Sequence, residues 1–149
     1  VPYTAYSARK SYLKQHPEVI QSFTNAIQKG LDYVNSHSSE EIAKVISPHF
    51  KETPVDKLAL IVDRYKSQDT WKEDTVFEEN SFTLLKRILE EAGELKAEVP
   101  YNELVTMDFS KSSKKFSITP LTNTLYSYII PLIITASHYY AKVLASSLC

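Results

Sequence analysis

The sequence predicts a mainly helical protein with one short strand at its N-terminus, and glycine content and apolar spacing are the main reasons. Only two glycines, Gly30 and Gly93, occur in 149 residues, where about 7% is usual. Glycine supplies the positive φ of tight turns and phosphate-binding loops. Glycine-rich nucleotide motifs are therefore excluded, and turn-rich β-sandwiches and barrels are disfavoured.

The first two elements follow from the N-terminal 36 residues. Residues 1–7 are rich in Tyr, Thr and Val with Pro2 near the start, which predicts a strand or an extended segment. Pro17 suits the first turn of a long helix, which Asn35 to Ser39 ends. One apolar stripe follows at spacings of three and four, comprising Ile20, Phe23, Ile27, Leu31 and Val34. Gly30 sits inside this helix at a cost of ~1 kcal/mol relative to Ala, which favours close packing there.

The next two helices are marked by their starting residues. Ser38-x-x-Glu41 matches a capping box, and Pro48 ends the helix that it opens. Thr53 followed by Pro54 predicts an N-cap and a first-turn proline for the second. Their inward residues are predicted to be Ile42, Val45 and Ile46 in the former, and Val55, Leu58, Val62 and Tyr65 in the latter.

Residues 66–76 are polar, contain Trp71, and are predicted to be a loop. The helix after them has Phe82, Leu85, Ile88 or Leu89, and Ala92 facing inward. Gly93 suits the C′ position of that helix, where a left-handed conformation is common. Residues 100–109 are predicted to form a short terminal helix.

Charge divides the chain into two units, 1–109 and 110–149. The first carries 13 basic and 18 acidic residues, a net of −5, whereas the second carries four lysines and no acid, a net of +4. Such asymmetry indicates different environments or origins. The start at Val1, without a leader, favours a processed chain or a fragment.

No residue pattern points to catalysis, a metal or a cofactor. The four histidines form no HxxxH pair, and the one cysteine, Cys149, excludes a cysteine zinc site or an intrachain disulfide. The GxSxG motif is absent, and adjacent acids such as Glu40 and Glu41 do not face each other on a helix. The negative charge of 1–109 disfavours nucleic acid as a partner.

Three stretches of the first unit together resemble one protein family. They are PYTAYSARKSYLKQHPEVIQSFTNAIQKGLDYVNSHSSEEIAKVI, DRYKSQDTWKEDTVFEENSFTLLKRILEEAGEL and VPYNELVTMDF. The order of these stretches and the final sequence EEAGEL followed by VPYNELV resemble the C-terminal third of substrate-binding proteins of ATP-binding-cassette importers. The branch is the one that serves nitrate, sulfonates, taurine and thiamine-pyrimidine precursors.

The resemblance implies a type II periplasmic-binding-protein-like fold, with two α/β lobes that close on a small molecule by hinge motion. It also implies an extracytoplasmic location, a membrane anchor in the full-length protein and a membrane permease as partner. Residues 1–8 would match the crossover strand to the first lobe, and the following helices would cover that lobe. Without the sheet that they cover, we expect these helices to collapse into a bundle, to form a homo-oligomer, or to be marginally stable.

Four residues are the candidates for ligand contact. The entry segment holds Tyr3, Thr4 and Tyr6, which the resemblance places near the hinge and cleft. Tyrosine offers a stacking face and a hydroxyl group for a pyrimidine or a small anion. Trp71, alone in its polar loop, is the fourth. The alternative for all four is packing within the sheet, the hinge or the lobe surface.

The second unit does not follow the family. Lys111, Lys114 and Lys115 precede the apolar run LYSYIIPLIITA at 125–136, which is shorter than the ~20 residues that span a bilayer. Three interpretations stay open: a frameshifted or fused gene end, a membrane-associating segment, and a core element that substitutes for missing parts.

Together these patterns favour the solute-binding component of an importer, which binds a small molecule and is not an enzyme. The alternatives are an enzyme of the same fold that resembles a thiamine-pyrimidine synthase and uses pyridoxal phosphate, and a helical interaction fragment. Nothing in the chain supplies a cofactor-anchoring motif for the enzyme.

Overall fold

A computed structural model describes residues 5–113, and this part of the chain is helical. The longer helices are α2 (Pro17–Ser36), α3 (Ser39–Ile46), α4 (Val55–Ser67) and α5 (Glu79–Glu91). The short ones are α1 (Lys10–Gln15), the 3₁₀ helix η1 (Ser47–His49), α6 (Tyr101–Leu104) and α7 (Asp108–Ser113). The predicted helical class is confirmed for these residues, whereas the periplasmic-binding-protein-like fold stays a prediction.

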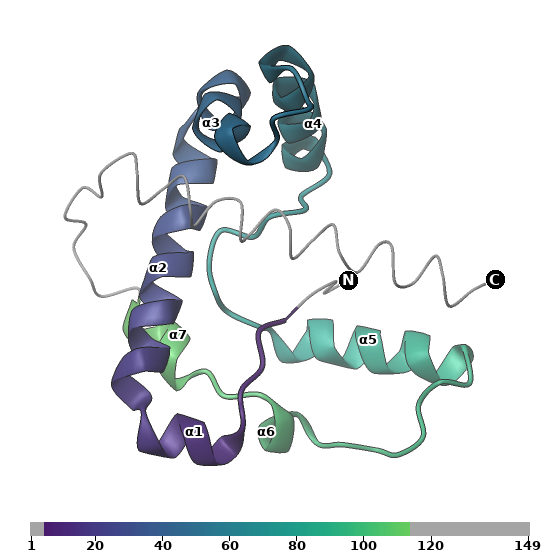
Figure 1. Cartoon of the computed structure of the whole chain (residues 1–149). Helices are drawn as coiled ribbons and strands as arrows, with labels where there is room; N and C mark the ends of the chain where they lie inside the picture. The colour runs from purple at the N-terminus through teal and green to yellow at the C-terminus, as the bar shows by residue number, and fades with distance from the viewer. Residues whose placement is uncertain (1–4, 114–149) are drawn as a thin grey trace.

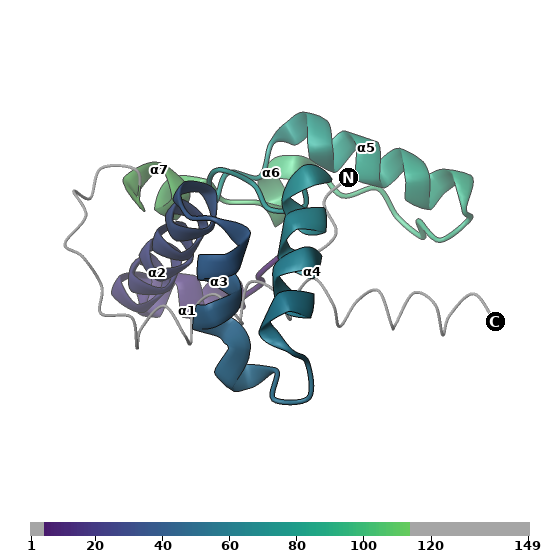
Figure 2. The ribbon, with the colours of Figure 1, turned by 90° about the horizontal axis from the view of Figure 1, so that it is seen from above.

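The long helix α2 is the axis on which most of the other helices are arranged (Figure 1). Helices α3 and α4 pack side by side at its C-terminal end, and α7 lies along a lower part of it (Figures 1 and 2). Helix α5 stands apart from α2, α3 and α4. It is tied instead to α6 through the edge-to-face contact of Phe82 with Tyr101, and Phe82 also meets Phe77, in the segment before α5, edge-on.

The core lies where α2, α3 and α4 meet. Its buried members come from the C-terminal half of α2, from α3 and α4, and from the loop after α4; they are Ile27, Leu31, Val34, Ile42, Ala43, Ile46, Leu58, Val62 and Trp71. The predicted stripe of α2 is therefore buried from Ile27 onward, whereas Phe23 is 38% exposed. Gly30, which was predicted to allow close packing, is buried in the same half of the helix.

The helix ends confirm two local predictions. The capping box is present, since Ser38 Oγ accepts from the Glu41 N–H at 3.3 Å and Glu41 Oε2 accepts from the Ser38 N–H at 2.9 Å. Gly93 has φ 72° after α5. Its N–H and that of Glu94 donate to the carbonyls of Glu90 and Leu89, at 3.0 and 2.8 Å, which is a Schellman ending.

Three expectations need correction. Pro54 has an extended ψ of 146° and is therefore the N-cap of α4, which begins at Val55. Thr53 lies one residue too early to be the N-cap and makes no cap bond. Val55 is 39% exposed instead of inward, because it opens the first turn, outside the α3–α4 contact. The predicted terminal helix is two short helices, α6 and α7, separated by the extended Val105.

The predicted N-terminal strand is not present in its described part. Residues 5–9 have no regular secondary structure, and residues 1–4 lie outside the described residues. A strand needs a neighbour to complete its hydrogen bonds, and no strand occurs among residues 5–113. Helix α7 runs through the predicted boundary at Phe109, while most of the second unit, residues 114–149, lies outside the described residues.

The capping box gives a pH-dependent prediction. The backbone hydrogen bond from Ser38, then its side-chain bond, lower the pKa of Glu41. A lowered carboxyl pKa contributes stability above the ordinary value of about 4.3, and that contribution is lost as the pH falls through the folded-state value. Glu41→Gln should therefore destabilise the chain at neutral pH and have less effect in acid, as followed by urea unfolding. Glu90→Gln on α5 is the control, because the exposed Glu90 side chain has no hydrogen bond or ion pair among the described residues. An equal pH dependence of the two variants would contradict the prediction.

Candidate functional site

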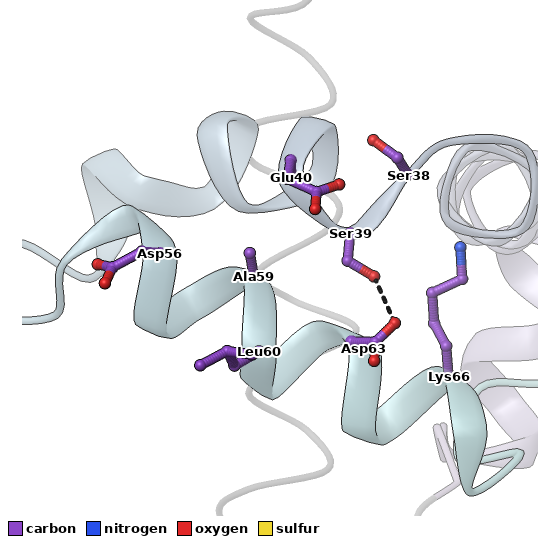
Figure 3. Close-up of a pocket in the computed structure, with 8 residues that line it drawn as sticks. All are labelled: Ser38, Ser39, Glu40, Asp56, Ala59, Leu60, Asp63 and Lys66. Carbon is purple, nitrogen blue, oxygen red and sulfur yellow. Dashed lines mark hydrogen bonds between the residues drawn. The ribbon is translucent and has the colours of Figure 1, made fainter.

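A groove lies between α3 and α4, and we call it the α3–α4 groove (Figure 3). Its volume is about 730 Å³ and it opens broadly to solvent. One wall is the start of α3 and the other is the side of α4. The lining residues are Ser38, Ser39, Glu40, Asp56, Ala59, Leu60, Asp63 and Lys66.

Acidic groups dominate the lining of this groove. Glu40, Asp56 and Asp63 contribute three carboxylates against the single ammonium of Lys66. Asp63 Oδ1 accepts a hydrogen bond from Ser39 Oγ at 3.3 Å, which joins the two walls (Figure 3). Lys66 Nζ donates to the carbonyl of His37 at 2.7 Å, at the C-terminal end of α2, where a cation is favourable.

The Ser39–Asp63 hydrogen bond is the hydroxyl–carboxylate contact of the groove, and no cluster of three or more potential metal ligands occurs in the described part of the chain. No helix within residues 5–113 is long and apolar enough to cross a membrane.

The sequence-predicted ligand residues are not gathered at the groove. Tyr3 and Thr4 lie outside the described residues. Tyr6 is 51% exposed and its ring meets that of Phe23 edge-on, with centroids 4.9 Å apart. Partial burial raises the pKa of the Tyr6 hydroxyl above its usual value. Tyr6 therefore covers part of α2, as the packing alternative expects, and its role in ligand contact stays a prediction.

Trp71 lies in the core. It is 8% exposed, and its ring meets that of Tyr65 edge-on with centroids 5.4 Å apart. Its Nε1 is buried and has no acceptor among the described residues. This placement agrees with the packing alternative, and a contact with ligand stays a prediction.

Sequence analysis missed a polar stripe on α2 that positions distant segments. Gln28 Nε2 donates to the Glu73 carbonyl at 3.0 Å, while its Oε1 accepts from the Thr75 N–H at 3.2 Å. Gln21 Nε2 donates to the Phe109 carbonyl at 3.0 Å. The stripe, named here the polar stripe, is Gln21, Asn25, Gln28, Asp32 and Asn35.

The spacing of this stripe was a usable signal. Its members recur every three or four residues, like an apolar stripe, which places them on one face of the helix. They hold the loop after α4 and helix α7 against α2 through hydrogen bonds to backbone groups. Ser110 adds a bond from its Oγ to the Thr75 carbonyl at 2.8 Å.

Comparison with known proteins finds one relative with a binding role. The chain is 35% identical over 111 residues to "Putative binding protein YtlA" of Bacillus subtilis (strain 168), and the match covers 74% of this chain and 33% of that protein. The chain thus spans about a third of the length of the curated relative that it matches. The relative is named as a binding protein and not as an enzyme. No protein-family model matches the chain, and no solved structure matches it.

Gln28 offers a test of the polar stripe. Gln28 is 8% exposed, and Gln28→Ala would remove its two hydrogen bonds to the loop, to the Thr75 N–H and the Glu73 carbonyl. We expect a loss of about 1–3 kcal/mol in the free energy of unfolding, measured by urea denaturation. Ser22→Ala on the exposed side of α2 is the matched control, because Ser22 bonds only within the helix. Equal effects of the two variants would show that the stripe does not hold the loop.

Proposed function

We propose that this chain is part of the solute-binding component of an ATP-binding-cassette importer. The observation that carries the proposal is the 35% identity over 111 residues to a binding protein, together with the resemblance of residues 1–109 to such components. The component would work outside the cytoplasm and deliver its ligand to a membrane permease. The ligand class proposed is a thiamine-pyrimidine precursor, or else a sulfonate, nitrate or taurine.

The exposure of apolar side chains supports a place within a larger protein. Val19 and Phe23 on α2, Ile61 on α4 and Ile88 on α5 are between 38% and 46% exposed. Helices of a two-lobed α/β protein bury such residues against a sheet or a neighbouring helix. The matched stretch covers a third of the relative, which leaves room for the layers that would cover these side chains and for most of a ligand cleft.

A chimera tests the proposal. This chain would replace the aligned stretch of the Bacillus subtilis relative, and calorimetric titration would compare the chimera, the intact relative and the chain alone. The ligands are a hydroxymethyl-aminopyrimidine, taurine, an alkanesulfonate and nitrate. We expect the chimera to bind the same ligand as the intact relative, with an affinity within about tenfold, or 1.4 kcal/mol.

Two outcomes would count against the proposal. A chimera that is folded and monodisperse but does not bind the relative's ligand would refute a shared role for this stretch. An intact relative that binds none of the four ligands would refute the proposed ligand class. Circular dichroism and size-exclusion chromatography separate these outcomes from simple misfolding.

A further inference from the structure

The buried polar residues of the described part of the chain meet at one place, which we call the polar clasp. It consists of Gln28 on α2, Thr75 in the loop after α4, and Ser110 and Ser113 on α7; all but Thr75 are between 5% and 8% exposed. The Thr75 N–H donates to Gln28 Oε1 at 3.2 Å, and the Thr75 carbonyl accepts from Ser110 Oγ at 2.8 Å. Ser113 Oγ donates to the Ser110 carbonyl at 2.8 Å. Hydrogen-bonded buried polar groups favour one arrangement of the segments that carry them, so the clasp fixes Thr75 and α7 on α2.

The chain leaves the clasp after Thr75 and returns to it at α7. Between these points lie α5 and α6, and we call residues 77–104 the arm. Phe82 on α5 is 6% exposed and is covered by the rings of Phe77 and Tyr101, which also belong to the arm. It is not a member of the core at α2, α3 and α4. The arm therefore has a small apolar centre of its own.

Polar contacts also join the parts of the arm to one another. The Tyr101 hydroxyl donates to the Phe77 carbonyl, which ties α6 to the start of the arm. Lys86 Nζ on α5 lies 2.9 Å from Glu98 Oε1, in the segment that leads to α6. The Lys86 side chain is 22% exposed, so this ion pair is partly shielded from water. These contacts hold the arm together as one body.

The orientation of the arm depends on its two short links to the clasp. These links are Val76 and residues 105–107, and neither has regular secondary structure. Helix α5 does not pack along α2, α3 or α4 (Figures 1 and 2). Elements with few buried contacts to the rest of a protein move most readily, and short connecting segments between packed bodies are where hinge rotations occur.

We propose that the arm turns as one body about the polar clasp, with Val76 and residues 105–107 as the hinge. At 1.5 Å per residue, α5 is about 20 Å long. A rotation of about 15°, the size of known rigid-body rotations, would move its far end by about 5 Å. The proposal rests on contacts within residues 5–113 and is independent of the proposed transport role.

Double electron–electron resonance between pairs of spin labels tests the hinge in the full chain. Cys149→Ser first removes the one native cysteine. Lys57→Cys on α4 with Glu90→Cys near the far end of α5 measures the arm against the core, and all labelled positions are exposed. Lys57→Cys with Ser22→Cys on α2 is the control within the core, and Glu90→Cys with Asn102→Cys on α6 is the control within the arm.

We expect the distance distribution between the arm and the core to be broader than that of either control pair by about 5 Å. A distribution as narrow as that of the core pair would overturn the proposal, because the arm would then be rigid. Equal broadening of the pair within the arm would overturn it as well, because the arm would not move as one body. These comparisons use the unmodified clasp, so they do not depend on how a clasp variant folds.

A matched pair of serine variants on α7 tests the clasp as the pivot. Ser110→Ala removes the hydrogen bond to the Thr75 carbonyl, and it should broaden the distribution between the arm and the core further while the core pair stays unchanged. Ser112→Ala is the control, because the exposed Ser112 bonds only to the Asp108 carbonyl within the helix. Equal effects of the two variants would show that the clasp does not hold the arm.

Discussion

Replacing Ile42 with alanine should lower the free energy of unfolding by about 2–5 kcal/mol. Ile42 is fully buried, on the face of α3 that packs in the core between α2 and α4. The change removes apolar atoms from contact and leaves a cavity that the neighbouring helices fill only in part. Small domains have a free energy of unfolding of only about 5–15 kcal/mol. A loss of this size is a large fraction of that total, so the variant should be largely unfolded at moderate temperature.

The measurement is urea denaturation followed by circular dichroism at the helical band. Leu104→Ala is the matched control, because Leu104 is 66% exposed on α6 and loses little contact on truncation. Its unfolding midpoint should stay close to that of the unmodified chain. Equal midpoints for Ile42→Ala and the unmodified chain would show that α2, α3 and α4 do not share a cooperative core.

The elements that local patterns define could be predicted from the sequence. The capping box at Ser38 and Glu41 and the glycine ending at Gly93 depend on a few adjacent residues, and the structure confirms both. The apolar stripes of α2 and α4 also follow from spacing within one helix. The start of α4 was misplaced by one residue because Thr53 and Pro54 are compatible with two neighbouring cap positions.

Features that depend on distant partners could not be predicted in the same way. The polar stripe on α2 has the composition of a solvent-facing surface, and only the loop at 73–75, some 45 residues later, makes Gln28 a buried group. The α3–α4 groove depends likewise on how two helices with separate patterns pack. Trp71 occupies a polar stretch of sequence, so its burial depends on Tyr65 and the residues of α2 and not on its neighbours.

Trp71→Ala should lower the free energy of unfolding by about 3–5 kcal/mol. The indole is 8% exposed and belongs to the same core as Ile42. Trp71→Phe should cost much less, because phenylalanine keeps most of the ring contact with Tyr65. It also removes a buried Nε1–H that has no acceptor among the described residues, and an unsatisfied buried donor costs about 1–3 kcal/mol.

Intrinsic fluorescence gives an independent measurement, because Trp71 is the single tryptophan of the chain. Its emission should be blue-shifted in the folded state and should shift to the red in the same urea transition that circular dichroism reports.

Packing and ligand contact predict different behaviour of this signal. If Trp71 only completes the core, a ligand that binds the chimera should leave unchanged the difference in emission between the chimera and its Trp71→Phe variant, and that variant should bind the ligand with unchanged affinity. If Trp71 contacts the ligand, titration should quench that difference in emission, and Trp71→Phe should weaken binding while the urea midpoint stays near that of the unmodified protein. The second pattern would require the indole to be exposed to the ligand on binding, and its buried Nε1–H would then be the group that gains a partner.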